Sequence, residues 1–279
     1  MASRPIVLSI AGYDPSSGAG ITADIKTAAA LGCYAVTCVS ALTVQSTQGV
    51  FGVEPVRTEV VRETLARLAE DVEFAAVRIG MLGSEAVAEA VMEFLRQYGP
   101  PNVVLDPVLR SSSGTKLIDE RGLAVIRGQL LPLCDVITPN FHEAIALAEA
   151  DSENALASDS YGKNLQDVRR LAATLLESGC GAVVITGGHL PEPNDYLSSK
   201  AEGKTSERIF RGSRIESKAT HGTGCAFGMA LACGMAKGLP LVEAVGGAKE
   251  FVRKAILAAY PVGKGTGPMN HLFRLTEDQ

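Results

Sequence analysis

Short apolar runs alternate with longer segments of helical spacing along most of the chain. Six runs predict buried strands, over residues 6–11, 34–42, 75–81, 102–107, 134–139 and 182–188. Between them, apolar positions recur at helical spacing over residues 21–31, 58–68, 85–96, 121–131, 143–150 and 165–177. Strand and helix in this repeated order predict a parallel sheet covered on both faces, with ligands at the carboxyl ends of its strands.

Three regions depart from this alternation. Residues 151–164 are polar, which predicts a surface loop or an irregular entry to a helix. Residues 190–216 contain turn residues around two strand-like runs, and they predict an antiparallel hairpin at the sheet edge. Residues 260–275 form a glycine-rich tail. Because no linker or internal repeat separates these regions, we expect residues 1–279 to form one α/β domain.

Composition narrows the class of protein. The apolar fraction of 46% and the charged fraction of 20% are ordinary for a globular domain of this size. The net charge of −5 argues against nucleic acid as a partner, and no apolar run is long enough to cross a membrane. The six cysteines form no CxxC pair, which favours reduced thiols over disulfides or zinc. We therefore expect a cytoplasmic protein whose partner is neither nucleic acid nor a membrane.

Two glycine-rich loops follow predicted strands. The first, at residues 18–23, matches the pattern GxGxxA, but it stands several residues after its strand, and the next strand ends without an acid. Both differences argue against a nicotinamide site. The second, "THGTGC" at residues 220–225, leads into a helix of small apolar residues. Unpaired N–H groups at a helix N-terminus attract anions, so this loop is either an anion site or a tight turn before a core helix.

Carboxylates also follow two predicted strands. Asn140 and Glu143 in "TPNFHE" stand three apart at a helix start, which suits a capping box. The same pair suits a magnesium site, because Mg²⁺ is held through few carboxylates. Asp106 in "VVLDP" is either a turn residue or a carboxylate that faces phosphates and metal. The chain contains no GxxxxGK[ST] motif, so it is not a P-loop NTPase.

Together these motifs resemble the ribokinase-like superfamily, and within it the hydroxymethylpyrimidine/phosphomethylpyrimidine kinases of thiamine biosynthesis. The resemblance covers nearly the whole chain, in the order "IAGYDPSSGAGITADIKT", "ALTVQST", "IGML", "VVLDPV", "LLPLCDVITPN", "GGHL", "THGTGC" and "KGTGP". It implies a three-layer α/β/α sandwich with a mostly parallel sheet and an antiparallel edge hairpin. It also implies a homodimer that uses ATP and Mg²⁺ to phosphorylate 4-amino-5-hydroxymethyl-2-methylpyrimidine and then the monophosphate.

The resemblance assigns roles to individual residues. The pyrimidine pocket would contain Gly12, Asp24, Gln45, Met81 and Val108. In it, Asp24 and Gln45 would hydrogen-bond the ring and its amine, while Met81 and Val108 pack against the ring. Taken alone, Asp24 equally suits the first turn of a helix, and Met81 a core position.

The thiol of Cys225 stands where most ribokinase-like enzymes are expected to have an aspartate. We expect a pKa lowered by the helix N-terminus, and a role as a weak base or positioning group. Phosphoryl transfer needs little early proton abstraction. The larger role therefore falls to an anion hole formed by the N–H groups of Gly222, Thr223, Gly224 and Cys225.

For the nucleotide, the resemblance implies Asn140, Glu143, Thr186 and Thr220, with Asp106 and Glu143 on the metal ion. The chain departs from the family at Thr186, because the family usually has a lysine before the "GGHL" glycines. Lys218 and Lys264 are the candidates to supply the missing positive charge.

Three other functions stay open at this point. A pyridoxal or pyridoxine kinase has the same fold and a similar substrate. A hydrolase would use Cys225 with His221 or His189, although no third orienting group stands out. A pyrimidine-binding regulator without catalysis is compatible with threonine at position 186.

Overall fold

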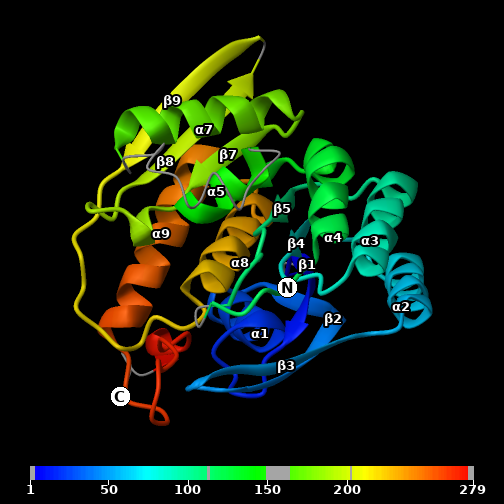
Figure 1. Cartoon of the computed structure of the whole chain (residues 1–279), viewed down its shortest axis with the longest axis horizontal. Helices are drawn as coiled ribbons and strands as arrows, with labels where there is room; N and C mark the ends of the chain where they lie inside the picture. Colours follow the sequence, from blue (N-terminus) through cyan, green and yellow to red (C-terminus); the bar gives the residue numbers. More distant parts are fainter. Residues whose placement is uncertain (1–3, 112–113, 149–163, 202, 276–279) are drawn as a thin grey trace.

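One mixed sheet forms the centre of the computed structural model, which describes residues 4–111, 114–148, 164–201 and 203–275. Its strands lie in the order β3-β2-β1-β4-β5-β6-β7-β8-β9 (Figure 1). They are β1 (Ile6–Tyr13), β2 (Tyr34–Ser46), β3 (Gly49–Pro55), β4 (Ala76–Ile79), β5 (Val103–Leu105), β6 (Val136–Ile137), β7 (Ala182–Ile185), β8 (Asp195–Ala201) and β9 (Lys204–Phe210). All six strands predicted from the sequence are present.

The middle of the sheet is parallel and its two edges are antiparallel. Strands β2, β1, β4, β5, β6 and β7 run in one direction. The β8–β9 hairpin pairs antiparallel with β7, which confirms the hairpin predicted within residues 190–216. A second antiparallel hairpin, β2–β3, closes the opposite edge and was not predicted. Both edges of the sheet are therefore antiparallel hairpins.

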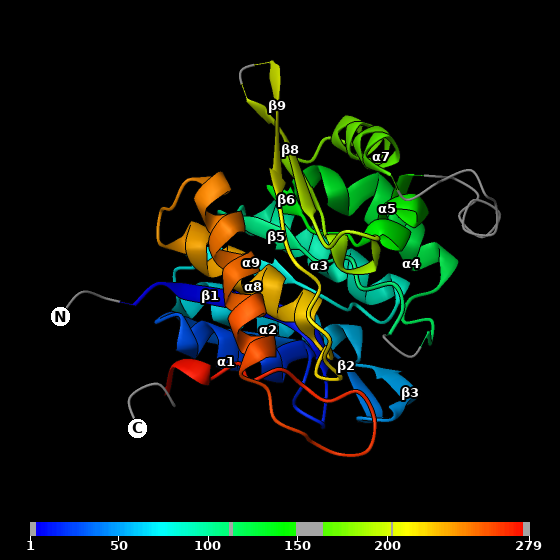
Figure 2. The same cartoon turned by 90° about the vertical axis from the view of Figure 1, so that its left-hand side faces the viewer.

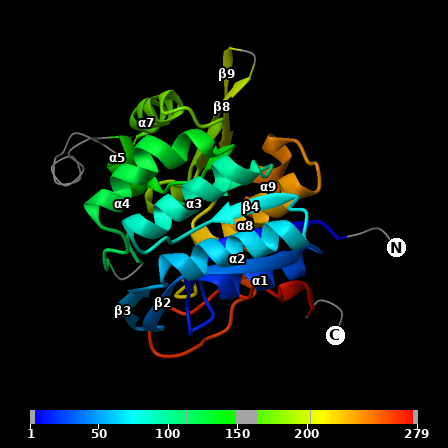
Figure 3. The same cartoon turned by 90° about the vertical axis from the view of Figure 1, so that its right-hand side faces the viewer.

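Helices cover both faces of the sheet, as Figures 2 and 3 show from two sides. Side chains along a strand alternate between the two faces of the sheet, so apolar strands need helices on both faces. Leu8 and Ile10 belong to one apolar core, whereas Val7 belongs to the other. The first core packs against α2 (Thr58–Asp71), α3 (Glu85–Tyr98), α4 (Glu120–Val125), α5 (Phe141–Ala148) and α7 (Leu165–Glu177); the second packs against α1 (Gly20–Ala30), α8 (Thr223–Ala236) and α9 (Leu241–Leu257). The three-layer sandwich is confirmed.

The predicted helices differ from the observed ones at two places. The helix predicted over residues 121–131 ends as α4 at Val125 and continues as a π turn, Ile126–Leu130, and a 3-10 turn, Leu131–Leu133. Pro132 prevents an α-helix from continuing through the last of these turns, because proline has no N–H to donate to the carbonyl of Gly128. Helix α9 was not predicted. Most of the loop predicted at 151–164, and residues 149–150 of the helix predicted over 143–150, lie outside the described residues.

Within the described ranges, no helix combines the length and the apolar character needed to cross a membrane.

Candidate active site

A cavity of about 220 Å³ opens where the parallel strands end. Its wall takes residues from the loops after β1, β4, β5, β6 and β7, from the β2–β3 hairpin and from the start of α8. A cavity of this size suits a small ligand rather than a macromolecule. Thirteen of the fourteen residues predicted for the site line it, and Asp24 does not: the thirteen are Gly12, Gln45, Met81, Asp106, Val108, Asn140, Glu143, Thr186, Thr220, Gly222, Thr223, Gly224 and Cys225.

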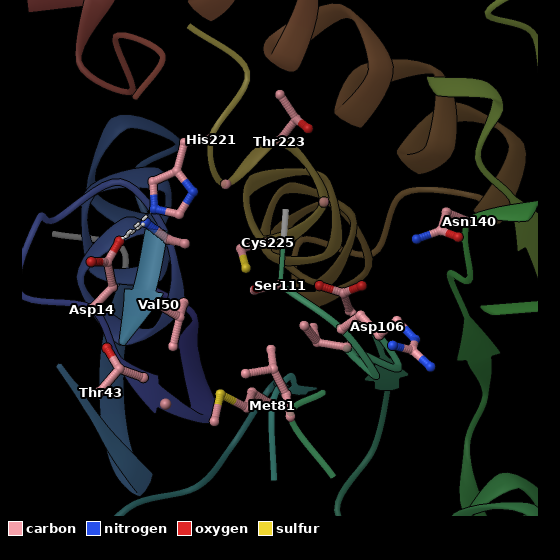
Figure 4. A pocket seen from close by; sticks show the side chains of 18 of the residues that line it. Asp14, Thr43, Val50, Met81, Asp106, Ser111, Asn140, His221, Thr223 and Cys225 are labelled. Carbon is pink, nitrogen blue, oxygen red and sulfur yellow. Dashed lines mark hydrogen bonds and ion pairs between the residues drawn. The ribbon is translucent and has the colours of Figure 1, made fainter. Parts of the chain in front are cut away.

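The cavity has two sides, with the start of α8 between them (Figure 4). Asp14, Thr43 and Met81 lie on one side, and Asp106 and Asn140 lie on the other. The first side includes an apolar cluster that contains Met81, Val50 and Val108. A Cβ atom on Gly12 would lie 3.0 Å from the Met81 sulfur, so this glycine and this methionine form a close-packed wall. A flat ring fits against such a wall.

Asp24 lies beneath the cavity and not in its wall. Its side chain is fully buried, accepts a hydrogen bond from Ser9 Oγ at 2.6 Å and pairs with Arg78 Nη1 at 2.9 Å. Burial raises the pKa of Asp24 to about 6, although the Arg78 guanidinium opposes the shift. The structure therefore corrects the assignment of Asp24 to the ligand pocket: its carboxylate is used to pair a buried cation.

Arg78 was missed by the sequence analysis. Its guanidinium is fully buried, reaches the cavity wall and joins Asp24 to Asp106, with Nη2 2.5 Å from the Asp106 carboxylate. Burial raises the pKa of Asp106, and the guanidinium opposes that shift. A lone arginine in the apolar strand "AAVRIGM" was the available signal, because buried charges are almost always paired.

Cys225 lies in the first turn of α8 and lines the cavity. Burial raises the pKa of its thiol to about 11; Arg78 lowers it, and the carboxylates of Asp106 and Asp24 raise it further. The expectation of a lowered pKa is therefore wrong, because burial and two carboxylates outweigh the helix N-terminus. At neutral pH this group is a thiol, which suits a positioning role better than that of a base.

The start of α8 lies against Asp106 and the first glycine loop. Gly222 precedes the helix with a φ of +79°, a conformation that favours glycine, and any Cβ there would collide with the carbonyl oxygen of Gly18. A Cβ on Gly224 would lie 3.8 Å from both carboxylate oxygens of Asp106. The first-turn N–H groups, which lack partners within a helix, thus lie beside the metal-site candidate.

The first glycine loop is folded around its own carboxylate. Asp14 accepts hydrogen bonds from the N–H groups of Ser16, Gly18 and Ala19, at 2.8, 3.1 and 2.8 Å. Burial alone would raise the pKa of Asp14, but hydrogen bonds from His221 and Ser16 lower it to about 2. These N–H groups already bind an anion from the protein, which agrees with the argument against a dinucleotide site.

His221 links the two glycine loops. Its Nε2 atom lies 2.8 Å from Asp14 Oδ2 and 3.1 Å from Gln45 Nε2. Thr43 holds the same glutamine by donating to its Oε1 at 3.1 Å. The imidazole thus contacts Asp14 and Gln45, which gives it a structural role at the ring side of the cavity and does not favour a Cys–His hydrolase. The side chain of His189 lies outside the described residues.

Asn140 and Glu143 form a reciprocal capping box. The N–H of Asn140 donates to Glu143 Oε2 at 2.9 Å, and the N–H of Glu143 donates to Asn140 Oδ1 at 3.0 Å. Burial raises the pKa of Glu143 to about 8, and the charge of Asp106 raises it further. The charge of Asp106 disfavours the ionised form of Glu143, and a bound divalent cation would relieve this effect. The donor set therefore fits Mg²⁺.

Neither Lys218 nor Lys264 supplies the positive charge that the family lysine would provide at position 186. Thr186 lines the cavity, whereas Lys218 and Lys264 are exposed and stand outside its wall. A different cation, Arg110, is part of the wall. The sequence analysis overlooked it because it follows the "VVLDPV" motif instead of belonging to it.

Comparison with known proteins gives consistent results. The family described as phosphomethylpyrimidine kinase matches residues 14–270. The hydroxymethylpyrimidine/phosphomethylpyrimidine kinase of Rhizobium meliloti (strain 1021) is 39% identical over 277 residues, which cover 98% of this chain and 99% of that protein. An ADP complex of Bacillus subtilis pyridoxal kinase superposes with a TM-score of 0.84 at 31% identity, covering 98% and 100% of the two chains. The phosphomethylpyrimidine kinase of Clostridium difficile 630 superposes with a TM-score of 0.75 at 32% identity, covering 91% and 100%.

Proposed function

This chain belongs to the phosphomethylpyrimidine kinase family, and from that premise we infer that it phosphorylates 4-amino-5-hydroxymethyl-2-methylpyrimidine and then its monophosphate. The observation that carries this inference is the cavity itself. One space brings together an apolar wall for a ring, the start of α8 and a pair of carboxylates. These are the parts that transfer between a small alcohol and a nucleotide requires.

The first turn of α8 is proposed to bind the transferring phosphoryl group. Its N–H groups donate hydrogen bonds to the phosphoryl oxygens, where charge is present throughout a loose transition state. The proton of the attacking hydroxyl leaves late in such a reaction. The Cys225 thiol, neutral at pH 7 because its pKa is raised to about 11, therefore orients the hydroxyl instead of first removing its proton.

We propose that ATP is the phosphate donor and that Asn140, Glu143, Thr186 and Thr220 contact it. Their common place on the cavity wall supports this assignment. Asp106 and Glu143 would hold Mg²⁺, which supplies positive charge to the phosphate oxygens when bound. Without a cation, the charge of Asp106 raises the pKa of Glu143, so an ion at this position has a direct electrostatic reason to bind.

The pyrimidine is proposed to lie on the side of Gly12, Gln45, Met81 and Val108. The amide of Gln45, whose Oε1 accepts a hydrogen bond from Thr43, is a donor and acceptor for ring nitrogens and the exocyclic amine. Asp24 does not contact the pyrimidine in this proposal; it forms an ion pair with Arg78, which lines the cavity.

Pyridoxal phosphorylation is the second candidate. The close superposition with a pyridoxal kinase at 31% identity favours it, because both substrates are small heteroaromatic rings that carry a hydroxymethyl group. The apolar wall would accept either ring. Only a direct comparison of substrates distinguishes these two activities.

The deciding experiment offers ATP and Mg²⁺ with the pyrimidine alcohol, its monophosphate or pyridoxal, and follows the products by mass spectrometry. We expect pyrimidine diphosphate from both pyrimidines. Product from pyridoxal alone would contradict the pyrimidine assignment and leave the second candidate. Ligand binding without any product would point to the non-catalytic regulator.

We further propose a single-domain, cytoplasmic homodimer. One sheet containing strands from residue 6 to residue 210 supports the single domain, and six free thiols support the compartment. Val44 and Phe51 on the β2–β3 edge hairpin are 67% and 71% exposed, which suits burial against a second copy. Sedimentation of the Phe51→Glu variant as a dimer would contradict this interface.

A further inference from the structure

The cavity that is proposed to hold phosphates contains few cations. Three acidic side chains line it, those of Asp14, Asp106 and Glu143, and Thr186 adds no charge. Among the described residues, the arginines of the wall are Arg78 and Arg110. The negative charges of these carboxylates repel phosphate groups. The positions of the two guanidinium groups therefore determine which anions the site can bind.

Arg78 is already matched by two carboxylates. Its Nη1 and Nη2 atoms lie 2.9 Å from Asp24 and 2.5 Å from Asp106, and none of its side chain is exposed. Its charge is therefore balanced inside the protein. A phosphate that approached it would compete with Asp106 for the same guanidinium.

Arg110 points toward the cavity because of the extended chain that carries it. Leu109 packs into the apolar core, whereas its neighbours on both sides, Val108 and Arg110, line the cavity. This alternation is that of a strand, in which every second side chain shares a face. The N–H of Leu117 donates to the carbonyl of Leu109 at 2.9 Å and fixes the turn.

The same turn is anchored to the wall that is proposed to bind the ring. Leu117 packs with Met81 and Ala41, and Val108 packs against that cluster. Thr115 Oγ1 also donates to the carbonyl of Val50 on the β2–β3 hairpin, at 3.4 Å. Arg110 is thus held at the ring side of the cavity, two residues from a proposed ring contact.

The guanidinium of Arg110 is exposed and weakly held. It donates one long hydrogen bond, from Nη1 to the carbonyl of Gly114 at 3.5 Å, and within the described part of the chain it forms no ion pair. Lys116, its partner across the turn, instead pairs with Glu120 at 2.6 Å and does not line the cavity. Of these two cations, only Arg110 is placed to bind an incoming anion.

We propose that Arg110 binds the phosphate of the monophosphorylated pyrimidine and so makes the second phosphorylation efficient. The proposal rests on the proposed function. A ring that packs against Met81 and Val108 carries its phosphate as a substituent. A long side chain two residues further along the extended segment, that of Arg110, can reach this phosphate. The planar guanidinium matches two phosphate oxygens at once, a geometry that lysine does not offer.

The test compares Arg110→Ala and Arg110→Lys with the control Lys116→Ala, which removes a neighbouring charge outside the cavity. The measured quantity is the ratio of kcat/KM for the monophosphate to kcat/KM for the alcohol, at saturating ATP. We expect Arg110→Ala to lower this ratio by about 10- to 100-fold, the size of a lost hydrogen bond to a charged group. Arg110→Lys should restore part of the loss, and Lys116→Ala should leave the ratio at the wild-type value.

Calorimetric titration of the monophosphate in the absence of ATP provides a second measurement, in which Arg110→Ala should weaken binding by a similar factor. An unchanged ratio, or an equal loss for both substrates, would overturn the proposal. A raised KM for ATP with the alcohol as acceptor, at an unchanged ratio, would assign Arg110 to the nucleotide and also overturn it. Failure of the proposed function would appear separately, as wild-type enzyme that does not turn over the alcohol.

Discussion

At the scale of single residues, the thiol of Cys225 is partly buried and lies among charges that keep it protonated. Arg78 lowers its pKa and two carboxylates raise it, on top of the larger effect of burial. The group is therefore suited to hold a hydroxyl in place and poorly suited to act as a thiolate.

Replacement of Cys225 tests this role. We expect Cys225→Ala to lower kcat by about 10- to 100-fold, toward the lower end of what acid–base groups contribute, with pyrimidine affinity nearly kept. Cys225→Asp should retain measurable turnover, because a carboxylate accepts the hydroxyl proton. Steady-state kinetics and calorimetric binding measure the two effects. A fully active alanine variant would remove Cys225 from the chemistry.

The raised pKa also predicts how this thiol reacts. A pKa of about 11 leaves little thiolate at pH 7, and the thiolate fraction increases about tenfold per pH unit up to the pKa. Alkylation of Cys225 by iodoacetamide, followed by mass spectrometry of its peptide, should accelerate steadily from pH 7 to pH 10. A plateau below pH 8 would contradict the protonated thiol.

We expect the replacement of Arg78 to lower the free energy of unfolding. Arg78→Met leaves Asp24 and Asp106 buried without their cation, and breaking a buried pair in this way costs about 3–5 kcal/mol. Arg67→Ala is the control, because its pair with Glu70 is exposed and contributes about 0–1 kcal/mol. Urea unfolding measures both. Addition of Asp24→Asn to Arg78→Met should recover part of the loss; equal stability of all variants would contradict the buried network.

The same residues show where sequence reasoning stops. The motifs identified thirteen residues that do line the cavity, because loops after parallel strands converge. Asp24 was misplaced since its partner, Arg78, stands 54 positions away on another strand. A sequence motif shows which side chains can bind a ligand. It does not show which of them instead pair with a residue that is distant in the sequence, because that pairing depends on the tertiary fold.

At the scale of elements, the glycine loop after β1 and the glycine loop before α8 pack closely against each other. A Cβ on Gly18 would lie 2.3 Å from the His221 ring, and one on Gly222 would meet the carbonyl of Gly18. The loop after β1 therefore positions the start of α8. The hydrogen bond between His221 and Asp14 completes this contact.

Gly18→Ala tests the interlock. The added methyl group must displace His221, which should weaken its hydrogen bond to Asp14, move it away from Gln45 and lower kcat/KM for the pyrimidine by about tenfold or more. Gly247→Ala is the matched control: nothing lies within 4 Å of its Cβ position, and alanine should stabilise helix α9 by about 0.5–1 kcal/mol. Unaltered kinetics in Gly18→Ala would show that the loops move independently.

Elements were predictable where the apolar pattern was unbroken. Helix α7 was predicted with its exact bounds, because Asn164 caps it and its apolar face is regular. Helix α9 was missed because Gly246 and Gly247 interrupt a sequence that tertiary packing nevertheless makes helical. Strand β3 was missed because its glycines and final proline suggest a turn, whereas pairing with β2 holds it extended.

At the scale of the whole molecule, His271 couples stability to pH. Its side chain is buried, its Nε2 atom has no hydrogen-bond partner among the described residues, and burial lowers its pKa to about 4. The unfolded chain binds this proton near pH 6.5, so the folded state loses stability as the pH falls from about 6.5 to 4. The loss should be about 1 kcal/mol per pH unit in this interval.

The His271→Leu variant removes the titrating group and keeps a buried apolar side chain. The difference in unfolding free energy between variant and wild type, measured in urea at pH 5 and pH 6.5, should increase in favour of the variant at the lower pH. Because other groups titrate equally in both proteins, the difference isolates His271. A pH-independent difference would contradict a neutral buried imidazole.

The interlocked glycine loops also have a consequence for how the protein is made. Asp14 and Gly18 leave the ribosome about two hundred residues before His221 and Gly222, and α8 covers β1, β4 and β5 from the far end of the chain. Synthesis proceeds from the N-terminus. The apolar face of β1, β4 and β5 that α8 covers in the folded protein is therefore exposed until α8 has been synthesised. We therefore expect the nascent chain to expose this apolar face during synthesis, and to become active only after the last third of the protein has been translated.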